Sequence, residues 1–283
     1  MILARFIAPG STATAIGVVA DGTVTPLRGS EPAGAAALGV VPLLHAPPAA
    51  GELADVRYAL AEVQLLTPVP QPSKIIGVGL NYGLHAQETG VDAPEYPELF
   101  AKLANALSGP GSPIEVADPQ DGVDYEGELV AIVARRVHGE LTPQQALAAI
   151  GGYTIANDVS ARSWQFRGSQ WMLGKSFDGY CPVGPWAVTA DAVPDVQDLR
   201  ICTRLNGAVV QEASTAEMLF TVAEIVRYVA QVATLEPGDL ILTGTPDGVG
   251  IAQKPPRYLT PGDVVEVEIE RIGKLVNEVV GAG

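Results

Sequence analysis

VDYEGELVAIV (123–133) places two carboxylates immediately before a continuous apolar run. GELVAIVARRV (127–137) is apolar on both faces at its centre, which predicts a strand buried within a sheet. Glu126 and Glu128 are two residues apart, so on a strand their side chains share one face. Water is scarce at the mouth of such a strand. Two unpaired carboxylates there would repel each other, and one would be forced to take up a proton.

A divalent cation would remove this conflict between the two glutamates. Hard oxygen ligands without Cys or His favour Mg²⁺, Mn²⁺ or Ca²⁺ over Zn²⁺. An E-x-E pair by itself is more often solvated at an exposed strand end. A third acid changes this interpretation, because Asp158 ends the apolar strand predicted at GGYTIAND (151–158). An acid in that place is also a common helix N-cap, so Asp158 suits either role.

The segments around this strand predict a mixed α/β fold that is rich in β-structure. Two helices are expected, at 142–150 with Thr142 as N-cap and at 221–233, where the apolar residues follow one helix face. The remaining apolar segments are short and bounded by turn signals, including an Asn-Gly hairpin signal and two Pro-Gly-Asp turns. The strands that they predict lie at 74–80, 204–211, 240–244, 264–269 and 273–280.

Residues 1–70 are interpreted as a small N-terminal β-rich domain, and residues 71–283 as the catalytic domain. The alternation at 15–27 around Asp21-Gly22 predicts a hairpin. Residues 28–50 are rich in Ala, Gly and Pro and read as a loop with a short helix. TPVPQPS (67–73) carries three prolines and is typical of a linker.

Composition limits the classes of partner. The net charge of −15 would repel a duplex nucleic acid. It is compatible with an anionic substrate, because a cation and a few lysines can make one pocket positive. No apolar run reaches the ~18 residues that span a bilayer, and the first residues lack a signal-peptide core. We therefore expect a cytoplasmic protein in which Cys181 and Cys202 are small buried side chains without a disulfide.

Seven motifs occur in an order that is similar to the fumarylacetoacetate hydrolase (FAH) family over about residues 72–283. They are GVGLNYGLHAQE (77–88), PELFAKLANALSGPGSPI (97–114), DYEGELV (124–130), GGYTIANDVSAR (151–162), GKSFDGYCPVGPW (174–186), RLNG (204–207) and PGDLILTGTPDGVG (237–250). The chain most resembles smaller bacterial acylpyruvate hydrolases and 2-hydroxyhepta-2,4-diene-1,7-dioate isomerases. The resemblance implies an FAH-type β-roll and a homodimer. It also implies Mg²⁺ or Mn²⁺ held by Glu126, Glu128 and Asp158, at a site that Ca²⁺ can also occupy in a crystal.

His85 stands apart from the other two histidines, His45 and His138, which are interpreted as ordinary residues. Glu88 follows it by three residues, so the two side chains share a face if HAQET (85–89) is helical. A carboxylate beside an imidazole orients the ring and raises its basicity, as a general base requires. The pair resembles a His-x-x-Glu pair that activates the hydrolytic water in smaller family members.

The resemblance also implies residues that face the substrate. Lys175 matches a family lysine that stabilises a developing enolate or oxyanion. The expected substrate-binding residues are Tyr82, Lys102, Arg162, Gln165, Gln170 and Thr245. Arg162 could equally form a structural ion pair. The chain has Leu103 after Lys102, where the family often has Pro, and Ser163 where relatives often have Asp.

The function expected from these residues is metal-dependent hydrolysis of a C–C bond in a small acidic β-diketone or 2-oxo acid, such as an acylpyruvate or fumarylpyruvate formed in aromatic catabolism. The alternatives are an isomerase, decarboxylase or dehydratase that acts on a 2-oxo acid through the same metal-bound enolate, since fold and ligands do not separate these reactions. A metal-dependent phosphodiesterase and a non-catalytic 2-oxo acid binder are further alternatives. Loops 83–97 and 163–173 are expected to choose the substrate's tail and could close over it.

Overall fold

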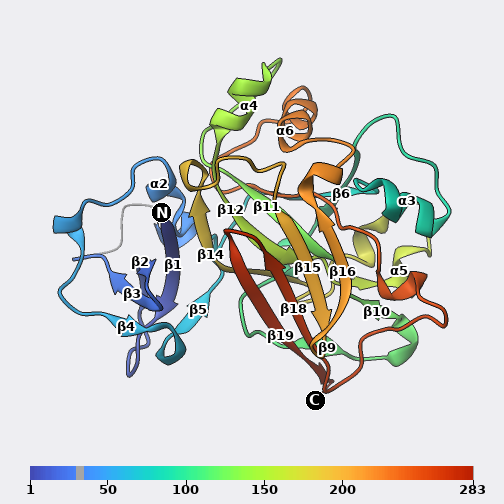
Figure 1. Ribbon diagram of the computed structural model, residues 1–283, viewed down its shortest axis with the longest axis horizontal. Helices are drawn as coiled ribbons and strands as arrows, with labels where there is room; N and C mark the ends of the chain where they lie inside the picture. Colours follow the sequence, from blue (N-terminus) through green and yellow to red (C-terminus); the bar gives the residue numbers. More distant parts are fainter. Residues whose placement is uncertain (30–34, 283) are drawn as a thin grey trace.

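Strands dominate the computed structural model, which describes residues 1–29 and 35–282 (Figure 1). Its strands are β1 (Ile2–Ile7), β2 (Thr14–Ala20), β3 (Thr23–Pro26), β4 (Tyr58–Ala59), β5 (Gln64–Leu66), β6 (Ile75–Gly79), β7 (Glu98–Lys102), β8 (Leu107–Ser108), β9 (Ile114–Val116), β10 (Val123–Asp124), β11 (Gly127–Val133), β12 (Ile150–Asn157), β13 (Ser160–Ala161), β14 (Cys181–Thr189), β15 (Arg200–Leu205), β16 (Ala208–Ser214), β17 (Leu240–Leu242), β18 (Val264–Ile269) and β19 (Gly273–Gly281). The α-helices are short: α1 (Ala35–Leu38), α2 (Val41–Leu44), α3 (Gly83–Thr89), α4 (Pro143–Ala149), α5 (Arg162–Gln165) and α6 (Val222–Ala230). The expected β-rich α/β fold is confirmed.

Most strands belong to a large sheet and a smaller sheet that pack face to face, and β10 and β13 pair as a separate two-stranded sheet. The twelve-stranded sheet runs β4-β3-β2-β1-β14-β12-β11-β17-β6-β7, with β5 and β8 attached at its side. The five-stranded sheet has the order β16-β15-β18-β19-β9, and β15, β18 and β19 pack against β11, β12 and β14 (Figure 1). The apolar strand that carries Glu128 is therefore central in the large sheet and covered by the other. All seven residues of β11 are buried, as its continuous apolar run predicts.

The N-terminal segment extends the large sheet. β1 pairs antiparallel with β14, and the predicted hairpin forms as β2 and β3 with Asp21 and Gly22 at positive φ. Such φ values at both turn positions suit a two-residue hairpin. Helices α1 and α2 occupy part of the predicted loop at 28–50, of which residues 30–34 lie outside the described part of the chain. The division of the chain after residue 70 stays a prediction.

Local signals placed the predicted helices correctly. Thr142 and Thr221 cap α4 and α6 through capping boxes, in which each threonine oxygen accepts from a backbone N–H three residues on. The strand predicted at 127–137 is shorter, because the N–H groups of Ala134 and Arg135 turn to the carbonyl of Ala149. Cys181 and Cys202 are buried free thiols, as expected. Within the described ranges, no helix is long and apolar enough to cross a membrane.

Gly127 lies where the two sheets approach most tightly beside the carboxylates. A Cβ atom there would stand 2.2 Å from Thr203 Oγ1 and 2.9 Å from Val267 Cγ1 of the smaller sheet. We expect Gly127→Ala to destabilise the fold by about 1–3 kcal/mol, since two packed layers must separate. Urea unfolding measures this, with Gly51→Ala as control because its Cβ meets nothing within 4 Å. Equal stability of the two variants would contradict this account of the sheet contact.

Candidate active site

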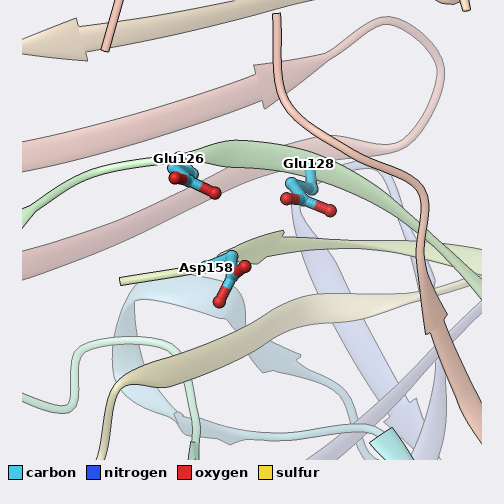
Figure 2. A group of neighbouring side chains, drawn as sticks. All are labelled: Glu126, Glu128 and Asp158. Carbon is cyan, nitrogen blue, oxygen red and sulfur yellow. The ribbon is translucent and has the colours of Figure 1, made fainter. Parts of the chain in front are cut away.

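Antiparallel pairing of β11 with β12 brings the three acidic residues together. Glu126 directly precedes β11, Glu128 lies on it, and Asp158 directly follows β12. Because the start of one strand lies beside the end of the other, Asp158 N–H donates to the Glu126 carbonyl at 2.7 Å. All three carboxylates are buried, and one oxygen of each lies within 4.8 Å of the others (Figure 2). Figure 2 shows the side chains pointing toward a common centre.

The donor set fits a divalent cation. Burial raises the pKa of Glu128 well above its usual range, and the charges of Asp158 and Glu126 raise it further. The charge of Lys175 and the N–H of Gly244, which donates to Glu128 at 2.7 Å, oppose this shift without cancelling it. The site therefore holds more negative charge than its protein partners compensate. Three carboxylates with hard oxygen donors are the ligands that Mg²⁺ and Mn²⁺ prefer.

Buried cations hold two of the three carboxylates in place. Lys175 Nζ donates to Glu126 Oε2 at 2.6 Å and to Asp158 Oδ2 at 2.7 Å, and Lys102 pairs with the other oxygen of Asp158. Arg162 Nη1 donates to Glu126 Oε1 at 2.6 Å. Burial alone would raise the pKa of Glu126, but Lys175 and Arg162 outweigh it and lower that pKa to about 2. Burial likewise disfavours charged Lys175, yet Asp158 and Glu126 raise its pKa, so the ammonium persists.

Asp124 is a site residue that sequence analysis missed. It is fully buried and accepts from Arg162 Nε at 2.9 Å. It also accepts from the backbone N–H groups of Gly250 and Ile251, at 2.7 and 3.0 Å, and so anchors the loop that follows β17. The sequence does contain a signal for it. Asp124 lies two residues before Glu126, so it continues the two-residue spacing of Glu126 and Glu128.

Helix α3 presents His85 and Glu88 on one face, as their spacing predicts. His85 Nδ1 lies 2.8 Å from Glu88 Oε1, and Glu88 Oε2 accepts from Gly248 N–H at 2.9 Å. A carboxylate can only accept, so Nδ1 carries the proton and Nε2 keeps its lone pair. The same loop after β17 thus contacts Glu88 through Gly248 and Glu128 through Gly244.

A cavity of about 510 Å³ brings most of the candidate residues together. Those that line it are His85, Glu88, Glu126, Glu128, Arg162, Gln165, Lys175 and Thr245. The other candidates lie outside the lining. Asp158 and Lys102 are buried behind it, Tyr82 is packed in the main core, and Gln170 is exposed. Thr245 Oγ1 donates to the Gly127 carbonyl at 3.1 Å and accepts from Gln211, which fixes it beside β11.

Removing the charge of Asp124 is expected to weaken metal binding without removing a ligand. In Asp124→Asn, Arg162 loses its strongest partner and is drawn toward Glu126, whose oxygens it already contacts. Changes in such outer partners typically cost about 10–100-fold in metal affinity. Titration calorimetry with Mn²⁺ measures this, with Asp198→Asn, an exposed position, as the charge-matched control. Unchanged Mn²⁺ affinity in Asp124→Asn would contradict the positioning role.

Comparison with known proteins assigns the chain to a family. The profile described as fumarylacetoacetate (FAA) hydrolase, C-terminal, matches residues 74–280, and one described as Rv2993c-like, N-terminal, matches residues 1–68. The mitochondrial oxaloacetate tautomerase FAHD2A of Bos taurus is 45% identical over 240 residues, which cover 81% of this chain and 76% of the relative.

Two solved structures are similar over the full length of both chains. The 5-carboxymethyl-2-hydroxymuconate delta-isomerase of Mycobacterium smegmatis is 35% identical with a TM-score of 0.80. The fumarylacetoacetate hydrolase of the psychrophilic Exiguobacterium antarcticum is 37% identical with a TM-score of 0.83. The ordered motifs, the shared fold and the profile match agree, and the chain belongs to the fumarylacetoacetate hydrolase family.

Proposed function

We propose that this enzyme interconverts the keto and enol forms of a small 2-oxo acid and depends on a divalent metal. One observation carries the proposal: the oriented His85–Glu88 pair lines the same cavity as Lys175 and two members of the carboxylate triad, Glu126 and Glu128. Enolisation needs a base near C3 and positive charge near the 2-oxo oxygen, and the cavity offers both. The names of a tautomerase and an isomerase among the similar proteins support it.

Glu126, Glu128 and Asp158 would hold the metal. A divalent cation bound there supplies a Lewis acid for the substrate's carboxylate and 2-oxo oxygens and makes C3–H more acidic. Lys175, 2% exposed and lining the cavity, adds a fixed positive charge near the same place. Because the surrounding walls are buried, these charges act in a medium that screens them less than water does.

His85 carries the proton in this proposal. Its Nε2 takes the proton from C3, and the C3–H electron pair forms the C2–C3 double bond. The carbonyl electron pair moves to the oxygen, which is then protonated from solvent. The reverse sequence converts the enol to the ketone. Glu88 holds Nδ1–H and stabilises the imidazolium while the proton is on the ring.

Hydrolysis of an acylpyruvate, the expectation from the sequence, is the second candidate. The same His85–Glu88 pair, 2.8 Å apart, can take a proton from water instead of from C3. The hydroxide adds to the distal carbonyl, the C–C bond breaks, and the pyruvate enolate that leaves is protonated. The name of the hydrolase from Exiguobacterium antarcticum supports this reaction. Decarboxylation or dehydration of a 2-oxo acid would pass through an equivalent enolate.

An ultraviolet assay separates the two candidates, because enols of 2-oxo acids absorb and their ketones do not. We expect the enol of phenylpyruvate to relax faster with enzyme and Mg²⁺ than with enzyme and EDTA, without fragments. Acetylpyruvate that disappears with formation of pyruvate and acetate would favour hydrolysis instead. If the enzyme accelerates none of these reactions in Mg²⁺ or Mn²⁺, the proposed function is wrong.

A further inference from the structure

An aromatic wall adjoins the charged end of the cavity. Phe100 of β7 and Trp171 both line it, with ring centroids 5.8 Å apart in an edge-to-face arrangement. Phe100 also lies with its ring centroid 5.0 Å from Lys175 Nζ, so the wall starts beside the ammonium. Further apolar side chains continue the lining: Val78, Phe166, Val249 and Ile251.

The G-x-G of β6 is what seats these rings. A Cβ on Gly77 would lie 2.2 Å from Phe100 Cζ, and one on Gly79 would lie 2.3 Å from Trp171 Cζ3. Val78 between them is part of the cavity lining. The two glycines therefore let both rings lie against the backbone of β6. The backbone of β6 thus holds the aromatic wall formed by Phe100 and Trp171 in place.

The cations around the site are already matched by protein carboxylates. Lys175 pairs with Glu126 and Asp158, Lys102 pairs with Asp158, and Arg162 Nη2 lies 2.7 Å from Asp124 Oδ2. Four buried carboxylates (Asp124, Glu126, Glu128, Asp158) thus face three buried cations, an excess of one negative charge. A bound divalent cation would offset this excess and attract one ligand carboxylate, while Glu88, which also lines the cavity, adds further negative charge.

Glu98 adds negative charge next to the aromatic wall. It is two residues before Phe100 on β7, so both side chains share a face, and both line the cavity. Within the described part of the chain, no basic side chain pairs with Glu98. Glu98 is exposed, so it acts at the open end of the cavity. A second carboxylate on the ligand would meet a like charge there, beside apolar side chains.

From these observations we propose that the cavity selects 2-oxo acids with one carboxylate and an apolar substituent at C3, and discriminates against 2-oxo dicarboxylic acids. This inference rests on the proposed function for the position of the 2-oxo acid group. Phe100 and Trp171 receive the substituent, and Glu98 repels a distal carboxylate. Glu98, Phe100 and Trp171 are therefore specificity-determining residues.

Binding of two matched ligands tests the selectivity without keto–enol interconversion of either ligand. Trimethylpyruvate and 3,3-dimethyloxaloacetate differ only by a methyl group in place of the distal carboxylate, and neither has a C3–H. Titration calorimetry of the Mg²⁺-loaded protein is expected to give a dissociation constant about tenfold or more lower for trimethylpyruvate. That follows from the added apolar contact and the avoided like charge. Equal affinities, tighter binding of the dicarboxylate, or binding of neither at millimolar concentration would overturn the proposal.

Reversing the charge of Glu98 tests whether this residue causes the preference for trimethylpyruvate. Glu98→Arg is expected to reduce the preference for trimethylpyruvate by about tenfold or invert it. Glu95→Arg, an exposed neighbour outside the cavity lining, makes the same change in net charge and should keep the wild-type ratio. Equal ratios in the two variants would remove Glu98 from the proposal.

The outcome of these binding experiments does not depend on whether the proposed function is correct. Neither ligand can enolise, so the selectivity can hold in a protein that does not catalyse tautomerisation. A tautomerase that binds both ligands equally would refute the selectivity alone.

Discussion

Glu128→Gln is expected to lower the affinity for Mn²⁺ or Mg²⁺ by at least about 100-fold and to abolish metal-dependent turnover. Losing an outer partner of a ligand costs about 10–100-fold, so losing a ligand charge should cost more. Among the described residues, Glu128 is the triad member without an ion-pair partner, and Gly244 N–H is its hydrogen-bond donor. Its charge is thus uncompensated except by a bound cation. Titration calorimetry with Mn²⁺ gives the affinity directly.

The same variant should fold at least as well as the wild type when metal is removed. Glutamine keeps the shape and can still accept from Gly244, but it removes the carboxylate that Asp158 and Glu126 repel. Thermal unfolding in EDTA is expected to show an equal or higher Tm. Glu278→Gln, an exposed position, controls for net charge. Wild-type Mn²⁺ affinity in Glu128→Gln would contradict the metal site.

His85→Gln is expected to lower kcat by about 10²–10⁴-fold, which is the usual contribution of a positioned general base. Glutamine can still donate to Glu88 but has no basic nitrogen at the place of Nε2. Because His85 is not a ligand of the triad, Mn²⁺ affinity should stay at the wild-type value. This split between turnover and metal binding separates the base from the ligands.

A matched control is available for the base. His138 is exposed and outside the cavity lining, so His138→Gln should keep wild-type kcat in the same assay. Glu88→Gln is expected to fall between the two, because His85 keeps its base but loses the charge that orients it. Full activity of His85→Gln would assign proton transfer to another group.

Sequence reasoning predicted what local periodicity and turn chemistry determine. The strand after Glu126, the cap at Thr142, the helix at 221–233 and the shared face of His85 and Glu88 all follow from spacing within a few residues. The grouping of Asp158 with the glutamates came from strand ends and the family resemblance. The antiparallel pairing of β11 with β12 explains it physically.

Contacts between distant segments could not be read from the sequence. Nothing in the first residues indicates that β1 pairs with β14, nearly two hundred residues away. Lys102 was expected to touch substrate, whereas burial places it behind Asp158. No local pattern indicates that Phe100 and Trp171 lie against the G-x-G of β6. Such ion pairs and ring contacts depend on which strands become neighbours.

Exchange of C3 protons with solvent tests the central claim most directly. 2-Oxobutanoate in D₂O with the Mg²⁺-loaded enzyme would be followed by proton NMR, which detects enolisation without any net reaction. The account predicts enzyme-dependent loss of the C3–H signal that disappears in EDTA and in His85→Gln. Exchange no faster than in Mg²⁺ buffer alone would contradict an enolising site in this cavity.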